Sequence, residues 1–302
     1  MMGPDATSNR NPSSDRHRVV LDQERLSQMI PNSRSESDAV LEWLASLLKV
    51  RIADTRESRE KMSSALGLTD WRAPYLIGLA GSVASGKSTL SSRLMNLLTD
   101  EDSGERVTSV STDNFLLPTA ALKARGVMAR KGFPESYDRR QLLAFVEAMS
   151  AGEREVSCPV YTHETYDVVP GKFRTFNRPG VLIIEGLNVL QTRRGAPTDH
   201  AFISDYFDTS IYLDANQSDL GIWYERRFAD LVRRSDVAHP FYGQFKSMSE
   251  TEIEAAALER WKAINLPNLR KNIEPTRSRA DIILHQNSNH LIDQVSFSKH
   301  WL

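Results

Sequence analysis

The chain has 302 residues, of which 40% are hydrophobic and 25% are charged, and its formal net charge is −1. This composition is typical of a globular protein with one large α/β domain or two small ones. A net charge close to zero argues against nucleic acid or a membrane surface as the main partner.

Two further observations concern the compartment. Cys158 is the single cysteine, so an intramolecular disulfide is excluded and a reducing, cytoplasmic location is expected. Because Cys158 precedes Pro159 with no helix start nearby, we expect a buried small residue rather than a reactive thiol. No apolar stretch approaches the ~20 residues of a transmembrane helix, and the first residues lack the apolar centre of a signal peptide.

The N-terminal part is predicted to lie outside the main domain, which we place at residues 71–302. Residues 1–18 are polar and without periodicity, which predicts disorder. Residues 19–70 are predicted to be a helical segment packed on the main domain, either as one helix or as two helices broken near Ala53. Ser35 or Ser37 is a possible cap of this helix, and Gly67 is the expected end.

Residues 75–98 have the pattern of a strand, a glycine-rich loop and a helix. In such a loop backbone N–H groups wrap a polyphosphate, Lys87 neutralises the terminal oxygens, and Ser88 is a ligand of Mg²⁺. A glycine-rich turn that only joins two elements is the less favoured alternative. The expected nucleotide-binding residues are Gly81, Ser82, Val83, Ala84, Ser85, Gly86, Lys87, Ser88 and Thr89.

The rest of the chain alternates between strand and helix patterns, which predicts a three-layer α/β fold with a mainly parallel central sheet and helices on both faces. The expected strands are 106–112, 181–184, 211–213 and, as the last one, 281–284. The expected helices are 142–149, 220–231 and 253–264, with a small hairpin at 156–169. Residues 123–138 are predicted to be a long basic loop, which either clamps an anion through Lys123, Arg125, Arg130 or Lys131 or is an ordinary solvated loop.

Two carboxylates follow predicted strands, and in an open parallel sheet ligands lie beyond the carboxyl ends of the strands. Asp113, Glu185 and the loop 81–88 should therefore share one crevice. We expect Asp113 to accept the proton of an attacking hydroxyl and Glu185 to support the metal. The alternatives are a turn or helix cap for Asp113 and a structural ion pair for Glu185.

Arg227 is the candidate cation for the negative charge that develops during phosphoryl transfer, because it lies one turn after Trp223 and Tyr224. The alternative is a surface ion pair with Glu225 or Asp230. Either reading places Arg227 on a helix.

The acceptor side is predicted from three residues, Tyr161, His163 and Tyr166, which bring two hydroxyls and an imidazole within six positions. Phe228, Leu231 and Phe241 are candidates for an apolar wall, which indicates a small acceptor with polar and aliphatic parts. A lone histidine is often structural, so the role of His163 stays open on this reasoning.

Eight motifs resemble, in order and spacing, those of the type I, bacterial pantothenate kinases, which are phosphate-loop kinases related to uridine kinase and phosphoribulokinase. The resemblance covers about residues 70–291, and KGFPESYD and IIEGLNVLQ are marks of this family against those relatives. The motifs are GSVASGKST (81–89), TDNF (112–115), KGFPESYD (131–138), PVYTHETYDVVPG (159–171), IIEGLNVLQ (183–191), FDTSIYLDA (207–215), WYERRF (223–228) and NIEPTRSRADIIL (272–284).

This resemblance implies phosphorylation of pantothenate by ATP with Mg²⁺, giving 4′-phosphopantothenate in the first step of coenzyme A biosynthesis. It implies a homodimer that coenzyme A and its thioesters inhibit in competition with ATP. It also implies phosphate and metal contacts for Lys87 and Ser88, the base role for Asp113, metal support by Glu185, and a place near adenine for His290. The residues that it places against pantothenate or the transferred group are Tyr161, His163, Tyr166, Tyr224, Arg227 and Asn265.

Three positions depart from the family pattern. Asn114 stands where a glycine is usual, Gln286 where a lysine is usual, and Ser92, next to Arg93, where an arginine usually meets ATP phosphate and coenzyme A. We therefore expect intact chemistry with weaker inhibition by coenzyme A. The alternatives are a kinase for another small alcohol, such as uridine or a sugar phosphate, and a nucleotide or coenzyme A sensor without turnover.

Overall fold

The computed structural model describes residues 17–32, 37–68, 70–99, 106–192 and 201–302. The predicted disorder of residues 1–18 therefore falls almost wholly outside the described residues. Among the described helices, none combines the length and the apolar character that a membrane crossing requires.

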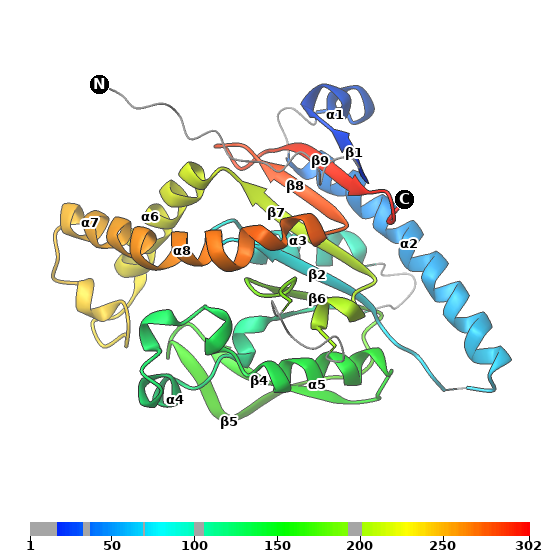
Figure 1. The fold of residues 1–302 in the computed structure, drawn as a ribbon, viewed down its shortest axis with the longest axis horizontal. Coiled ribbons are helices and arrows are strands. Elements are labelled where there is room, and N and C mark those ends of the chain that lie inside the picture. Colours follow the sequence, from blue (N-terminus) through cyan, green and yellow to red (C-terminus); the bar gives the residue numbers. More distant parts are fainter. Residues whose placement is uncertain (1–16, 33–36, 69, 100–105, 193–200) are drawn as a thin grey trace.

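A seven-stranded sheet forms the centre of the protein, with the strand order β1-β9-β8-β7-β2-β6-β3 (Figure 1). Strands β8, β7, β2, β6 and β3 pair in parallel, whereas β9 is antiparallel to both β8 and β1. The mainly parallel sheet is therefore confirmed. The strands are β1 (Arg18–Leu21), β2 (Tyr75–Gly81), β3 (Val107–Ser111), β6 (Val181–Gly186), β7 (Thr209–Ala215), β8 (Ile282–Gln286) and β9 (Ile292–Ser298).

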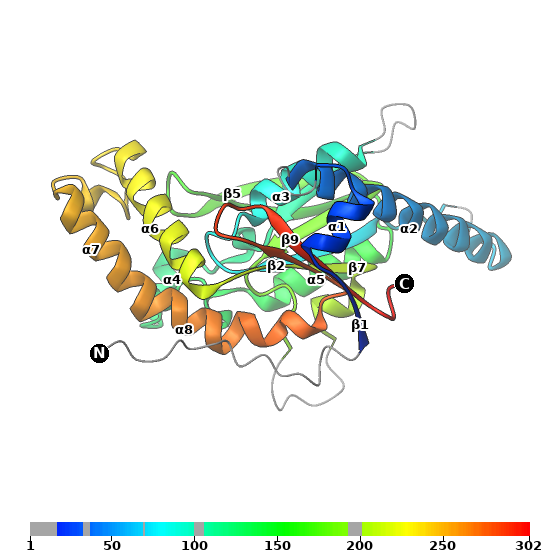
Figure 2. The ribbon, with the colours of Figure 1, turned by 90° about the horizontal axis from the view of Figure 1, so that it is seen from above.

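Helices cover both faces of this sheet, as predicted. Ile77 and Leu79 of β2 pack in one core with α2 and α3, while Leu76 and Ala80 point to the cores on the other face. Figure 2 shows α1, α2 and α3 on one side of the sheet and α8 on the other. The helices are α1 (Gln23–Met29), α2 (Ser37–Ala65), α3 (Lys87–Leu98), α4 (Thr119–Ala124), α5 (Arg139–Ser150), α6 (Gln217–Arg234), α7 (Glu250–Arg260) and α8 (Leu266–Asn268).

Strands β4 (Val156–Thr162) and β5 (Asp167–Phe176) form a separate two-stranded antiparallel sheet. This is the predicted hairpin, longer than expected. It lies beside α4 and α5 in Figure 1. Buried residues of β4, including Cys158, share a core with α5 and with the inner face of β6, which anchors the hairpin to the domain.

The N-terminal segment differs from the prediction in its first residues, whereas the single unbroken helix, one of the two alternatives, is confirmed. Residues 18–21 form strand β1 rather than part of a helical segment, because their partner β9 lies almost a whole chain length away and local pattern does not reveal it. Helix α2 is one helix without a break at Ala53, since no proline or glycine interrupts it. Its predicted end is confirmed: Gly67 has φ 71°, and the Leu68 N–H bonds the Ser63 carbonyl at 2.8 Å.

Two further predictions were wrong. The basic stretch 123–138 is not a plain loop, because it contains the end of α4 and the 3₁₀ turns Met128–Arg130 and Pro134–Ser136. Strand β8 is not the last strand, because the chain turns back through residues 287–291 and adds β9 to the edge. The helix expected at 253–264 continues beyond α7 through π-helical turns to Ile273.

The packing of α2 predicts an asymmetric response to mutation. Leu44 is fully buried in the core under the first half of this helix, whereas Met62 in the second half is 63% exposed. We expect Leu44→Ala to lower the free energy of unfolding by about 2–5 kcal/mol, and Met62→Ala to change it by less than about 0.5 kcal/mol. Urea denaturation of the two variants tests this, and equal effects would mean that α2 is not docked as described.

Candidate active site

The glycine-rich loop joins β2 to α3 and is shaped to hold an anion. Gly86 has φ 90° and Ala84 has φ 63°, so the backbone is left-handed at two positions, one of them not glycine. A Cβ on Gly81 would lie 2.7 Å from the Leu213 carbonyl oxygen, so only glycine fits there. The hydroxyl of Ser82 is buried without a partner among the described residues, which suits a loop built around a ligand.

The register of the sheet brings the metal candidates together. Glu185 lies opposite Leu79 of β2 and Ser111 of β3, between the ends of the two strands. Ser88, in the first turn of α3, donates a hydrogen bond from its hydroxyl to Oε1 of Glu185 at 3.1 Å. Two adjacent oxygen ligands suit Mg²⁺, which takes one or two protein oxygens together with phosphate and water. Within the described residues no group of three or more potential metal ligands forms a closed metal cage.

Lys87 is the electrostatic centre of the site. Its side chain is buried, and the ammonium group donates to the Ser82 carbonyl at 2.5 Å. Burial lowers the pKa of Lys87 to about 8, against the opposing effects of Glu185 and Asp113, and Arg227 lowers this pKa further. Glu185, Asp113 and Arg227 are therefore all near enough to act electrostatically on the Lys87 ammonium group.

Asp113 lies on a 3₁₀ turn, Thr112–Phe115, directly after β3. Ser111 rather than Asp113 caps this turn, so the capping alternative for Asp113 is not what the structure shows. The hydroxyl of Tyr137 donates to Oδ1 of Asp113 at 3.2 Å. Burial first, and then the charge of Asp113, raises the pKa of Tyr137 well above its usual value, so this hydroxyl stays a donor.

Asn114 connects the turn to the hairpin. Its Oδ1 accepts from the Tyr161 N–H at 2.9 Å, and its Nδ2 donates to the Cys158 sulfur at 3.8 Å. The glycine usual at this position has no side chain for either bond. Cys158 is fully buried, and burial raises its pKa to about 11, which confirms the prediction of an inert buried thiol.

The predicted acceptor residues gather at the hairpin. The rings of Tyr161 and His163 meet edge to face with centroids 5.3 Å apart, although His163 itself is exposed. Tyr166 stacks on Phe241 at 4.6 Å, and the ammonium of Lys131 lies 3.8 Å from the centroid of the Tyr166 ring. Desolvation lowers the pKa of Lys131 to about 8.

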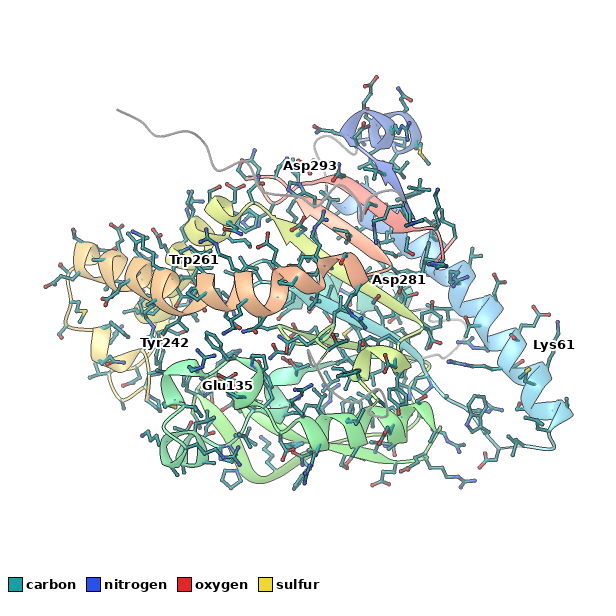
Figure 3. The ribbon with its side chains drawn as sticks, in the orientation of Figure 1. Lys61, Glu135, Tyr242, Trp261, Asp281 and Asp293 are labelled. Carbon is teal, nitrogen blue, oxygen red and sulfur yellow. The ribbon has the colours of Figure 1, made fainter. Side chains whose placement is uncertain are left out.

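The opposite side of this cluster comes from α6 and from the segment after α7. The ring of Tyr224 lies 6.1 Å from Phe228 and 5.7 Å from Trp261. Figure 3 shows Tyr242 and Trp261 on this side and Glu135 across from them. Tyr166 and Phe228 both contact the Phe241 ring, so the predicted apolar wall is present.

Arg227 and Asn265 are placed differently. Arg227 is close enough to Lys87 and to Tyr242 to influence both electrostatically, while Asp230 pairs with Arg234 at 3.0 Å rather than with Arg227. Asn265 lies half-buried in the π-helical turn Trp261–Asn265. In the described part of the chain it makes no side-chain hydrogen bond to another candidate residue, so the structure does not join it to the cluster.

His290 lies at a second hollow next to the phosphate loop. A cavity of about 290 Å³ is lined by residues of the loop, α2, α3 and the β8–β9 turn, among them Gly86, Arg93 and His290. The His290 ring stacks on Trp223 at 3.8 Å. Burial, and next Arg226, lowers the pKa of His290.

The departure at position 92 also has a structural account. Ser92 hydrogen-bonds the Ser88 carbonyl within α3. Arg93 lines the His290 cavity, but its guanidinium forms an ion pair with Asp38 of α2. A positive charge is therefore present at this cavity, with an acidic partner already in place.

Sequence reasoning missed two residues that hold the site in shape. Tyr137 was part of a quoted motif, but no pattern showed that it contacts Asp113. Asn268 is buried, donates to the Gly132 carbonyl at 3.0 Å and accepts from Asn272 at 2.8 Å, which ties the C-terminal helical segment to the KGFPESYD segment. The sequence signal that could have identified Asn268 is an asparagine at a position of the helix face that is otherwise apolar.

Comparison with known proteins identifies the family. Residues 76–234 match the model of the phosphoribulokinase / uridine kinase family. The pantothenate kinase of Leifsonia xyli is 45% identical over 85% of this chain and 79% of its own length. The chain belongs to the pantothenate kinases. The pantothenate kinase of Corynebacterium aurimucosum is 46% identical over 80% of this chain and 79% of its own length.

Two solved structures resemble this pantothenate kinase in fold, and both are described as kinases. A candidate fructose transport system kinase of Silicibacter sp. TM1040 is 27% identical with a TM-score of 0.53, covering 67% of this chain and 85% of its own. YFH7 of Saccharomyces cerevisiae, a candidate phosphate-loop kinase with a circular permutation, is 15% identical with a TM-score of 0.54, covering 83% and 99%.

Proposed function

We propose that the protein transfers the γ-phosphoryl group of ATP to the terminal hydroxyl of pantothenate. The observation that carries this proposal is the convergence of Lys87, Asp113, Glu185 and Arg227 at one point, with an aromatic cluster beside it. The identity of about 45% to pantothenate kinases supports the choice of acceptor.

In the proposed reaction the acceptor oxygen attacks the γ-phosphorus, its proton passes to Asp113, and the bond from phosphorus to the bridging oxygen breaks to leave ADP. Tyr137 holds one carboxylate oxygen of Asp113, which leaves the other for the acceptor hydroxyl. Lys87 and Arg227 offset the negative charge on the transferred group. Ser88 and Glu185 would hold Mg²⁺, which neutralises phosphate charge when bound.

The acceptor side combines polar and apolar groups in the way that pantothenate would require. The Lys131 ammonium and the tyrosine hydroxyls suit its carboxylate and amide, and Phe228 and Phe241 suit its gem-dimethyl group. A homodimer and competition between coenzyme A and ATP belong to the same proposal. We expect that competition to be weak, because Asp38 already pairs with Arg93.

The acceptor is tested by a panel of pantothenate, uridine and ribulose 5-phosphate in a coupled assay of ADP release with ATP and Mg²⁺. We expect kcat/KM for pantothenate to exceed that for the other two by about 100-fold or more. Turnover of uridine or the sugar phosphate alone would establish a different kinase. ATP binding without turnover of any acceptor would establish a sensor.

The base role predicts a separation of chemistry from binding. We expect Asp113→Asn to lower kcat by about 100-fold or more, while a non-hydrolysable ATP analogue binds within about threefold of wild type. Enzyme kinetics and calorimetry measure the two effects. Asp230→Asn is the matched control, because this carboxylate pairs with Arg234 on the surface and should keep wild-type kcat.

The pKa of Lys87 predicts how nucleotide binding depends on pH. The charged form binds phosphate, and with a pKa of about 8 the free protein loses this charge as the pH rises through 8. The Kd of the ATP analogue should therefore rise about tenfold between pH 7 and pH 9.

Two variants identify the group responsible. Lys87→Arg stays charged throughout this range, so its Kd, whatever its value at pH 7, should be nearly independent of pH. Lys131→Met should keep the wild-type dependence, although the pKa of Lys131 is also about 8. A flat wild-type profile in calorimetry would contradict the role of Lys87.

A further inference from the structure

A cavity of about 470 Å³ lies away from the candidate active site. It is bounded by α2 and by the residues that precede the central strands, including Tyr75 at the start of β2 and Gly180 just before β6. The phosphate loop follows the other end of β2, and a seven-residue strand spans roughly 20 Å. In Figure 1 the second half of α2 projects on this side, and Figure 3 shows Lys61 near its end, remote from Tyr242.

Arginine dominates the charged lining of this cavity, which we call the arginine cavity. Four separate parts of the chain contribute, and Glu60 is the single carboxylate that lines it within the described residues. The arginines are Arg56 and Arg59 of α2, Arg72 of the segment before β2, Arg106 before β3 and Arg178 before β6.

Two of these arginines are held in place by carboxylates outside the cavity. Arg59 pairs with Asp208 at 2.7 Å and donates to the Pro74 carbonyl at 3.1 Å. Arg178 pairs with Asp70 at 2.9 Å, and Asp70 also accepts from Arg154 at 2.7 Å. The bonds from Arg178, and next from Arg154, lower the pKa of Asp70 to about 2.

Positive charge remains after these pairs are counted. Arg72 and Arg106 are exposed and form no ion pair with another described residue, and the one side-chain bond of Arg106 runs to the Asn177 carbonyl at 2.7 Å. Arg59 and Arg178 are thus paired, whereas Arg72 and Arg106 keep unpaired charge within the described part of the chain. Two guanidinium groups are thus available to an incoming anion.

The backbone around Arg178 is strained, which indicates that its position is specified. Arg178 has φ 41°, a left-handed conformation that a residue before proline rarely takes. Its Nε donates to the Gly152 carbonyl at 3.2 Å. Gly152 in turn packs against the Arg72 backbone so closely that a Cβ would lie 2.8 Å from the Arg72 carbonyl oxygen. This corner of the cavity is therefore preorganised, and Trp71 adds a half-buried aromatic wall.

We propose that the arginine cavity is a second ligand site, which binds a small phosphate-bearing anion. Guanidinium groups present paired N–H donors that match phosphate oxygens, and a concave wall with several arginines gathers such anions more strongly than single surface cations do. Arg72 and Arg106 provide the free contacts, while Arg59 and Arg178 provide the fixed rim. The site is independent of the proposed kinase reaction, because none of its residues lies at the phosphate loop.

The test is calorimetric titration of the full chain with inorganic pyrophosphate, without Mg²⁺ and with a non-hydrolysable ATP analogue saturating the phosphate loop. We expect wild-type protein to bind pyrophosphate, and R72Q/R106Q to bind it at least tenfold more weakly. The matched control is R233Q/R234Q, which removes the same charge from two exposed arginines of α6 that pair with Glu250 and Asp230. It should bind within twofold of wild type, and urea denaturation should give similar stability for both variants.

Three results would overturn the proposal. One is absence of binding once the ATP analogue is present. Another is an equal loss in the two double variants, which would show a general charge effect only. The third is binding that needs more than about 10 mM pyrophosphate, which would show an adventitious ion only. No outcome depends on whether pantothenate is the acceptor.

Discussion

The structure depends on keeping opposite charges together at the dry carboxyl edge of a parallel sheet. Lys87 is buried where a lone ammonium group would be strongly disfavoured, and Glu185 and Asp113 offset that cost. Glu185 lies near the end of β6 and Lys87 follows β2 across the phosphate loop, and both strands are fully buried, whereas Asp113 follows the partly buried strand β3. The apolar sheet therefore fixes the charges at short range without any of them being paired so tightly that a phosphate could not enter.

The acceptor side is attached to this edge by polar side chains rather than by the sheet. Asn114 bonds the hairpin at Tyr161, and Tyr137 bonds Asp113 from the opposite direction. The turn that carries the carboxylate is therefore held from both sides. Asn268 plays a similar part for the C-terminal helical segment through Gly132. Asn114, which departs from the family pattern, thus adds a link between the hairpin and the turn that carries Asp113.

Much of this site could be predicted from the sequence, because its residues sit in local patterns. The phosphate loop and Glu185 follow apolar runs, Asp113 follows a strand rich in hydroxyl residues, and parallel strands bring such ends together. The pairing of β1 with β9, the contact of Tyr137 with Asp113 and the arginine cavity could not be predicted, because each joins segments that are far apart in sequence. The role of Asn265 stays a prediction, because only the family resemblance indicates it and the expected contact is with the substrate rather than with another side chain.

The pairing of β1 with β9 also determines when the domain can be completed. Residues 18–21 are synthesised first among the described strands, and their partners, residues 295–298, are separated from them by more than 270 residues of chain. The side chain of Arg18 bonds Ala280, Asp281 and Ser296, so β1 can dock on the sheet only after these residues are present. Closing so long a loop is slow, because the chain loses conformational entropy before the stabilising contact forms. The nascent chain therefore leaves β1 without its partner until residues 295–298 have been synthesised, so deletion of either strand should expose a new sheet edge.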